Sequence, residues 1–275
     1  MKSFFLSLGM LVITLSTFSQ SDTIFTNNEK IVCTVKEVTP DAIKFAYPNE
    51  ELINAVFKNT VQKIIFKSGR VQLFAENTSY KTVNGPKDFE NVTITKVESE
   101  VHGLFKLGDV GAKAKGTTEF SNQERVKQRA YRKIKMQAAI MHANIIFLTD
   151  TRTQGNKWGS QWGGSETAEA SFSGIAYSNV IPKFDDFVKI LGNKSKMLGT
   201  EKVVLDCGGS DLDVKEIHDY LNITRVYNEN GLIMMEGTID GVRKYNTFRV
   251  SSFTLDSFTI TFHDKDSIYS YRFSL

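Results

Sequence analysis

The sequence of 275 residues has little of what marks specialised classes of protein: it holds two cysteines, four prolines and two tryptophans. Two cysteines are too few for a disulfide scaffold, and the low proline content excludes a collagen-like chain. Neither sign of charge dominates, because 34 Lys and Arg face 31 Asp and Glu. The net charge of +3 therefore predicts no nucleic-acid partner, and the 41% of hydrophobic residues predict a sizeable core.

The chain also lacks an apolar run of the roughly 20 residues that a spanning helix needs. The longest one covers residues 4–18 and follows Lys2. Around its end, Thr17 and Ser19 are small residues of the kind that a signal peptidase recognises. We expect residues 1–19 to be a removable signal peptide; the alternative is an uncleaved anchor. The mature chain is then expected to have no transmembrane segment and to be exported to the periplasm, the outer surface or the medium.

Export would bring the two cysteines into an oxidising compartment, which permits a disulfide. Cys33 lies in a strand-like run and Cys207 precedes two glycines. A bridge needs their Cα atoms within about 7 Å, which the sequence does not decide. Both outcomes stay open, and two separate buried thiols are favoured.

Residues 20–83 predict a small antiparallel β-module. Three runs alternate apolar and polar residues, and turn pairs such as Pro40-Asp41 separate them. The inward residues are Ile31, Cys33 and Val35, then Ile43, Phe45 and Tyr47, then Val61, Lys63 and Ile65 beside Ile64 and Phe66. The order Asp22-x-Ile24, Ile43-x-Phe45-x-Tyr47 and Val61-x-x-Ile64 resembles the N-terminal β-module of many secreted bacterial proteins, a resemblance that implies no activity.

Residues 87–192 predict a central βαββ domain whose main element is a helix over 122–143. A capping box of Ser121 and Glu124 is expected to open this helix. Before it, 92–101 is strand-like and 104–116 is expected to be a glycine-rich connection. One face carries an apolar stripe at helical spacing, formed by Val126, Ala130, Ile134, Ala138 and Met141.

After this helix, a strand is expected to begin at Ile145 and to pair with a return strand over 168–180. A second helix is expected over 183–191, because Gly192 suits the position just after its end.

Two motifs in this segment carry a second resemblance. They are His142-Ala143-Asn144 at the helix end and Gly174-Ile175-Ala176-Tyr177 some thirty residues later. They are similar to the small envelope α/β domains of the stress-sensor lipoprotein and YbjQ-like type, which carry Gly-Ala-Asn after the helix. This chain has His142 in place of that glycine and lacks the cysteines that staple the sensor lipoproteins. The resemblance implies an α/β fold of the bacterial envelope.

Residues 200–275 predict an antiparallel β-module at the C-terminus. Asn230-Gly231 and Asp240-Gly241 are hairpin signals, and apolar residues alternate over 258–262 and 269–273. A short helix is expected over 210–221. The predicted class is therefore α+β, with β-rich N-terminal and C-terminal antiparallel modules on either side of the central βαββ domain.

Residues with a recognisable chemistry are few. No nucleophile elbow, phosphate loop or dinucleotide fingerprint is present, and no cofactor is expected. The acidic segment 206–219 holds the best metal candidates, although Lys215 stands where an EF-hand needs its third ligand and a helix cap explains the acids as well. The candidate metal ligands are Asp206, Asp211, Asp213 and His218.

Two surface features remain as candidate binding sites. Trp158 and Trp162 lie on a glycine-rich loop over 152–166, where they either stack on a sugar or a protein partner or fold back over the sheet. The second feature is the basic face of the main helix, which either meets anionic groups or is a solvated face. That face consists of Arg125, Arg129, Arg132 and Lys133.

The expected function is that of a secreted, non-catalytic binding or envelope-associated protein, with a glycan or an envelope protein as partner. The alternative is a hydrolase or metal-dependent enzyme whose site is assembled around 206–219.

Overall fold

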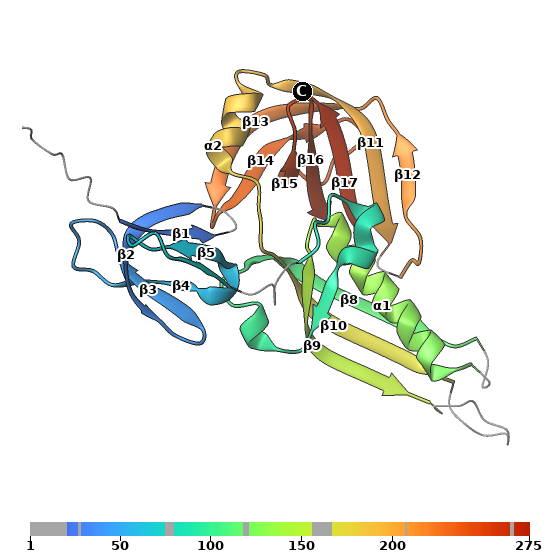
Figure 1. The fold of residues 1–275 in the computed structure, drawn as a ribbon. Helices are drawn as coiled ribbons and strands as arrows, with labels where there is room; N and C mark the ends of the chain where they lie inside the picture. Colours follow the sequence, from blue (N-terminus) through green and yellow to red (C-terminus); the bar gives the residue numbers. More distant parts are fainter. Residues whose placement is uncertain are drawn as a thin grey trace, which may run out of the picture.

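The computed structural model describes residues 21–26, 29–74, 80–117, 121–155, 167–206, 208–264 and 267–275. The described residues are 52% strand and 16% helix. They form three sheets, which are antiparallel apart from one parallel strand pair (Figure 1). In the described part of the chain, no helix combines the length and the apolar character needed to cross a membrane.

The N-terminal sheet has the strand order β4-β3-β2-β1-β5-β6 and is drawn in blue in Figure 1. The buried Asp22 carboxylate ties it together, since it accepts hydrogen bonds from the backbone N of Val35 at 2.8 Å and of Lys67 at 2.7 Å. Ile31, Cys33, Ile43 and Phe45 point into its core as predicted, together with Ile24, Val61 and Ile64, whereas Tyr47 is 40% exposed. The strands are β1 (Asp22–Thr26), β2 (Lys30–Val38), β3 (Ala42–Ala46), β4 (Asn54–Phe57), β5 (Val61–Ile65) and β6 (Val71–Leu73).

The central sheet has the order β7-β9-β10-β8. The expected glycine-rich connection over 104–116 is wrong, because these residues form the long edge strand β8. Val110, Ala112 and Ala114 alternate along it, and their small side chains are buried under the main helix. The elements are β7 (Thr93–Thr95), β8 (Phe105–Lys115), α1 (Gln123–Ile140), β9 (Ile145–Gln154) and β10 (Glu169–Ser178). Short 3-10 turns cover Lys58–Thr60, Pro86–Asn91 and Glu98–Glu100.

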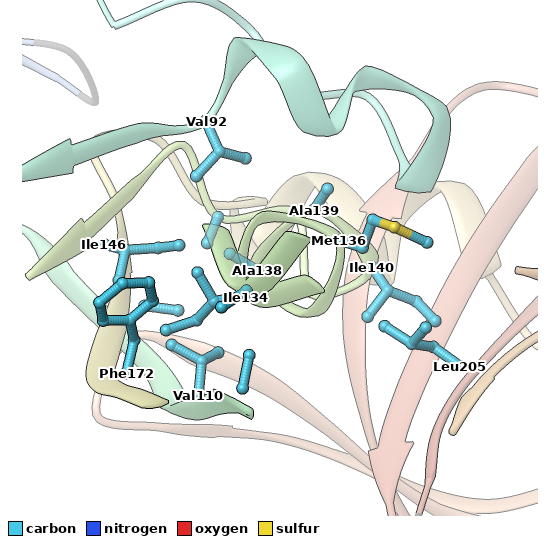
Figure 2. Close-up of a cluster of buried hydrophobic side chains, with 14 of the residues drawn as sticks. Val92, Val110, Ile134, Met136, Ala138, Ala139, Ile140, Ile146, Phe172 and Leu205 are labelled. Atoms are coloured by element: carbon cyan, nitrogen blue, oxygen red, sulfur yellow. The ribbon is translucent and has the colours of Figure 1, made fainter. Parts of the chain in front are cut away.

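Helix α1 buries the whole predicted apolar stripe, from Val126 to Met141. Its N-cap is Asn122 and not the expected Ser121: the Asn122 side chain accepts hydrogen bonds from the backbone N of Glu124 and Arg125 at 2.8 and 3.2 Å. An amide oxygen one residue later reaches the same unpaired N–H groups, which replaces the predicted box. Figure 2 shows Ile134 facing Val110 and Phe172 of the central sheet, while Ile140 faces Leu205.

The C-terminal sheet closes on itself. It has the order β12-β11-β13-β14-β15-β16-β17, and β11 also pairs with β17. Its interior holds aromatic residues that include Phe248, Phe258, Phe262, Tyr271 and Phe273, and Phe187 of α2 packs against Phe253 and Phe258. The elements are α2 (Phe184–Leu191), β11 (Lys196–Asp206), β12 (Asp213–Glu216), β13 (Tyr220–Glu229), β14 (Leu232–Ile239), β15 (Thr247–Phe253), β16 (Ser257–His263) and β17 (Ser267–Ser274).

Two local predictions fall in this region. The hairpin turn at Asn230-Gly231 is confirmed, with φ of 52° and 87°, the pair of positive values that a type I′ turn requires. The expected helix over 210–221 is wrong. Residues 213–216 instead pair with 204–201 of β11, so the backbone groups are satisfied by the sheet.

The closed sheet and the central sheet are joined through one core. Helix α1 lies between them, and Val203, Leu205 and Ile268 of the closed sheet pack in the same cluster as the α1 stripe (Figures 1 and 2). Arg249 of β15 adds a polar link, since its guanidinium donates to Leu107 O at 2.9 Å and to Met141 O at 2.8 Å. The carbonyl of Met141 lies at the negative end of the α1 dipole, which suits a cation.

Candidate ligand cleft

A cleft of about 680 Å³ opens where the end of α1, the end of β10 and the outer face of β15, β16 and β17 meet. Most of its polar lining consists of amide and hydroxyl side chains. Among the described residues, no Asp, Glu or Lys lines it, and its one guanidinium belongs to Arg272. Its uncharged polar groups include Asn84, Asn144, Asn179, Ser252, Thr254 and Ser257, and Tyr80 and Phe253 contribute aromatic rings.

The turn after α1 brings His142 into this cleft. The backbone N of His142 donates to Ala139 O, and that of Ala143 donates to Ala138 O, both at 2.9 Å. This is the Schellman ending of a helix, and His142 occupies its left-handed position with a φ of 60°. The helix therefore ends at Ile140, earlier than the expected residue 143. Glycine is the usual residue at this position. His142 replaces the glycine of the Gly-Ala-Asn pattern and therefore adopts a backbone conformation that is unfavourable for a residue with a side chain.

The cleft also holds the His142 side chain in its neutral form. Burial lowers the pKa of this imidazole to about 4, and the positive charges of Arg249 and Arg272 lower it further, against a weaker opposite effect of Asp88. In the described part of the chain, no hydrogen bond engages the His142 ring. A non-glycine residue in a left-handed conformation, at the wall of a cleft, is a pattern that clusters at functional sites.

Two asparagines of the cleft lining, Asn144 and Asn179, hold each other in place. The Asn144 amide donates to Asn179 Oδ1, and the backbone N of Asn179 donates to Asn144 Oδ1 at 3.4 Å. The backbone of Asn144 is held as well, since its N donates to Tyr177 O at 3.0 Å and its O accepts from Thr93 N at 2.9 Å. The residues of the two sequence motifs, Asn144 and Tyr177, therefore meet directly beside the cleft.

Two arginines, Arg272 in the cleft lining and Arg249 beside it, have different environments. Arg249 is half-buried, and its guanidinium donates to Leu107 O, Met141 O and, at 3.3 Å, Thr261 Oγ1. Burial lowers the pKa of Arg249 to about 10, so it stays charged at neutral pH. Arg272 is exposed at the cleft wall, and within the described residues its guanidinium has no hydrogen bond or ion pair.

The predicted basic face of α1 is occupied within the chain. Arg129 Nη2 donates to Lys115 O at 2.8 Å, and Lys133 Nζ donates to Lys113 O at 3.3 Å and to Gly208 O at 2.8 Å. The Arg132 guanidinium lies 5.3 Å from the centre of the Phe89 ring. Arg125 is exposed and has no partner of this kind in the described chain.

These contacts follow one line along the helix. One turn beyond Lys133, the Gln137 amide accepts from Gly111 N at 2.9 Å and donates to Gly111 O at 2.8 Å. Residues 129, 133 and 137 therefore satisfy outward backbone groups at 115, 113 and 111 of the edge strand β8. The basic face mainly covers this edge, which sequence reasoning missed because β8 itself was not predicted.

The remaining predicted site residues are not gathered into a site. Asp206 Oδ1 accepts from Ser267 Oγ at 2.7 Å, Asp213 pairs with Lys215 at 2.6 Å, and Asp211 and His218 are exposed on either side of β12. Across the described ranges, no three His, Cys, Asp or Glu side chains come close enough to hold a metal ion. Trp158, Trp162 and Cys207 lie outside the described residues.

Cys33 is a free, buried thiol, so it is not part of a disulfide. Burial raises its pKa to about 11, with a smaller contribution from the nearby charge of Asp22. A thiol with so high a pKa is unreactive at neutral pH.

Comparison of the chain with family models, with curated proteins and with solved structures finds no match.

Proposed function

We propose that this chain is an exported, non-catalytic binding protein of the bacterial envelope, and that the cleft between the central and closed sheets takes a glycan. In this proposal the fold is of the α+β class. The central segment 87–192 and the C-terminal segment 200–275 carry most of the cleft lining, and the N-terminal segment 20–83 is a β-module whose last residues, among them Tyr80, also line the cleft. The signal-like segment 1–19 supports export.

The observation that supports a glycan is the chemistry of the cleft lining. Hydroxyl and amide side chains both donate and accept hydrogen bonds, as the hydroxyl groups of a sugar do. Tyr80 and Phe253 offer apolar ring surface beside them, on which the C–H face of a sugar can pack. The volume of about 680 Å³ is in the range of small-ligand sites.

Binding is favoured over hydrolysis because no activated nucleophile lies among the described residues of the cleft. A catalytic serine needs a base within hydrogen-bond reach. Several serines line the cleft, but no hydrogen bond joins one of them to His142 within the described residues. Among the described residues of the acidic segment 206–219, no group of three His, Cys, Asp or Glu side chains could hold a metal ion.

The test is a titration of the 15N-labelled mature protein with N-acetylglucosamine trimer, cellotriose and maltotriose. We expect at least one of them to shift the side-chain amide signals of Asn144 and Asn179. Ser252→Phe, at the cleft floor, should weaken that binding more than tenfold by filling the cleft. Ser274→Phe makes the same change at an exposed position of β17 outside the cleft lining and should leave the affinity within twofold.

Absence of binding by all three sugars would refute the proposal. Equal binding by wild type and Ser252→Phe would refute the assignment of the site.

A further inference from the structure

The cleft has an excess of positive charge. Arg272 lines it with a guanidinium that no described residue engages, and Arg249 lies within electrostatic reach of the same wall. Arg249 is hydrogen-bonded to carbonyl and hydroxyl oxygens, with no carboxylate partner among the described residues. The guanidinium of Arg272 therefore lines the cleft, Arg249 adds positive charge beside it, and no acid among the described residues lines the cleft.

Acidic groups are nearby but lie on the other side of Arg272. Asp88 and Glu201 line a second, smaller cleft of about 230 Å³, whose wall also includes Arg272. The Asp88 carboxylate is occupied there, since its Oδ2 accepts from Asn84 N at 2.9 Å. Glu201 is the cross-strand partner of Arg272, but neither acid lines the large cleft, so an incoming anion there meets Arg272 with no acid among the described residues of the lining.

His142 adds a second, uncharged group to the lining of the same cleft. A neutral imidazole has one N–H donor and one acceptor nitrogen, so it can donate to an oxyanion without bringing a charge that must be desolvated. The guanidinium of Arg272 supplies the charge and a fork of N–H donors whose spacing matches the two oxygens of a carboxylate or phosphate. The hydroxyl and amide groups on the rest of the wall match a sugar ring.

We infer that the cleft selects an acidic glycan, with the oxyanion carried by the sugar paired to the Arg272 guanidinium beside the His142 imidazole. This inference rests on the proposed function and adds the chemical class of the ligand. The oxyanion is either a carboxylate or a phosphate, and the experiment separates the two.

The experiment compares three matched sugars in NMR titrations of the mature protein: N-acetylglucosamine, N-acetylmuramic acid and N-acetylglucosamine 6-phosphate. The second sugar adds a carboxylate to the first, and the third adds a phosphate. We expect at least one acidic sugar to bind at least tenfold more tightly than the neutral sugar at low salt. The preference should decrease as salt rises from about 0.05 to 0.5 M, because charge pairs at an open cleft are screened.

The variant Arg272→Gln should abolish the preference for the acidic sugars over N-acetylglucosamine. Arg272→Lys, which keeps the charge and loses the fork, should retain part of the preference. Arg243→Gln is the matched control, since Arg243 is exposed in the connection between β14 and β15, outside the cleft lining.

The possible results separate the two proposals. Equal affinity for neutral and acidic sugars, or a preference that survives in Arg272→Gln, overturns the inference and leaves glycan binding intact. If no sugar binds here or in the trisaccharide titration, the proposed function fails and the inference fails with it.

Discussion

Replacing His142 by asparagine tests the structural account of the turn after α1. Asparagine tolerates the left-handed conformation of this position better than other non-glycine residues, so the helix ending should persist. It does not titrate, so the variant removes the one feature under test, the buried imidazole. The comparison of the wild type with His142→Asn therefore reports how protonation of His142 changes the free energy of unfolding, separately from the geometry of the turn.

The magnitude follows from the pKa values in the two states. The pKa falls from 6.5 to about 4 on folding, so the unfolded chain binds more protons between these values. The stabilising contribution of the neutral imidazole is present above pH 6.5 and is lost as the pH falls toward 4. Between pH 7 and pH 5 this linkage should lower the free energy of unfolding of the wild type by about 2 kcal/mol relative to His142→Asn.

The assay is urea denaturation of both proteins at pH 5, 6 and 7. We expect the wild-type stability to fall more steeply with acidification than that of His142→Asn. His218→Asn serves as the control, because His218 is exposed between β12 and β13 and its variant should follow the wild-type profile. Parallel pH profiles for wild type and His142→Asn would refute the reasoning about this buried imidazole.

Three further variants test the core and the edge of the central sheet. Ile134→Asp buries an unpaired charge at a fully buried position and should lower the free energy of unfolding by several kcal/mol, as measured by denaturant titration. Gln137→Leu leaves both backbone groups of Gly111 without partners and should cost about 1–3 kcal/mol, whereas Arg129→Ala, at an exposed helix position, should cost about 1 kcal/mol or less; the reverse order would contradict the account of the β8 edge. Cys33 should react with a thiol reagent only at the rate of global unfolding, and fast labelling of the native protein would show that its burial is wrong.

Periodicity over many residues predicted the main helix and most strands of the described chain. The α1 stripe repeats over several turns, so local errors at the cap did not obscure it. By contrast, β8 was missed because Gly108 and Gly111 suggested a connection, and the alternation of Val110, Ala112 and Ala114 uses small side chains that give a weak signal. The helix expected over 210–221 depended on a cap-like pair at Ser210 and Asp213, and pairing with β11 overrode it.

The cleft had no local signal, because its walls come from residues far apart in the chain. Asn144 follows α1, whereas Arg272 lies in the last strand, and only the contact between the two sheets brings them to one cavity. The one available hint was His142 at a position where the resembling domains have glycine. The structure gives the physical meaning of that departure, since His142 has a φ of 60°, where glycine is usual.

The side chains of α1 that cover the edge of β8 also determine how this part of the protein unfolds locally. An uncovered edge strand has unpaired backbone N–H and C=O groups that can pair with a strand of another molecule. Such edges are where chains join into aggregates. Here three side chains of α1 occupy those groups, so the edge becomes available only when the helix departs. Helix and strand should then exchange their amide hydrogens together, as one cooperative unit. The basic side chains that the sequence suggested as a docking face for anions therefore help to protect this edge. Self-association through β8 requires that α1 first separates from it.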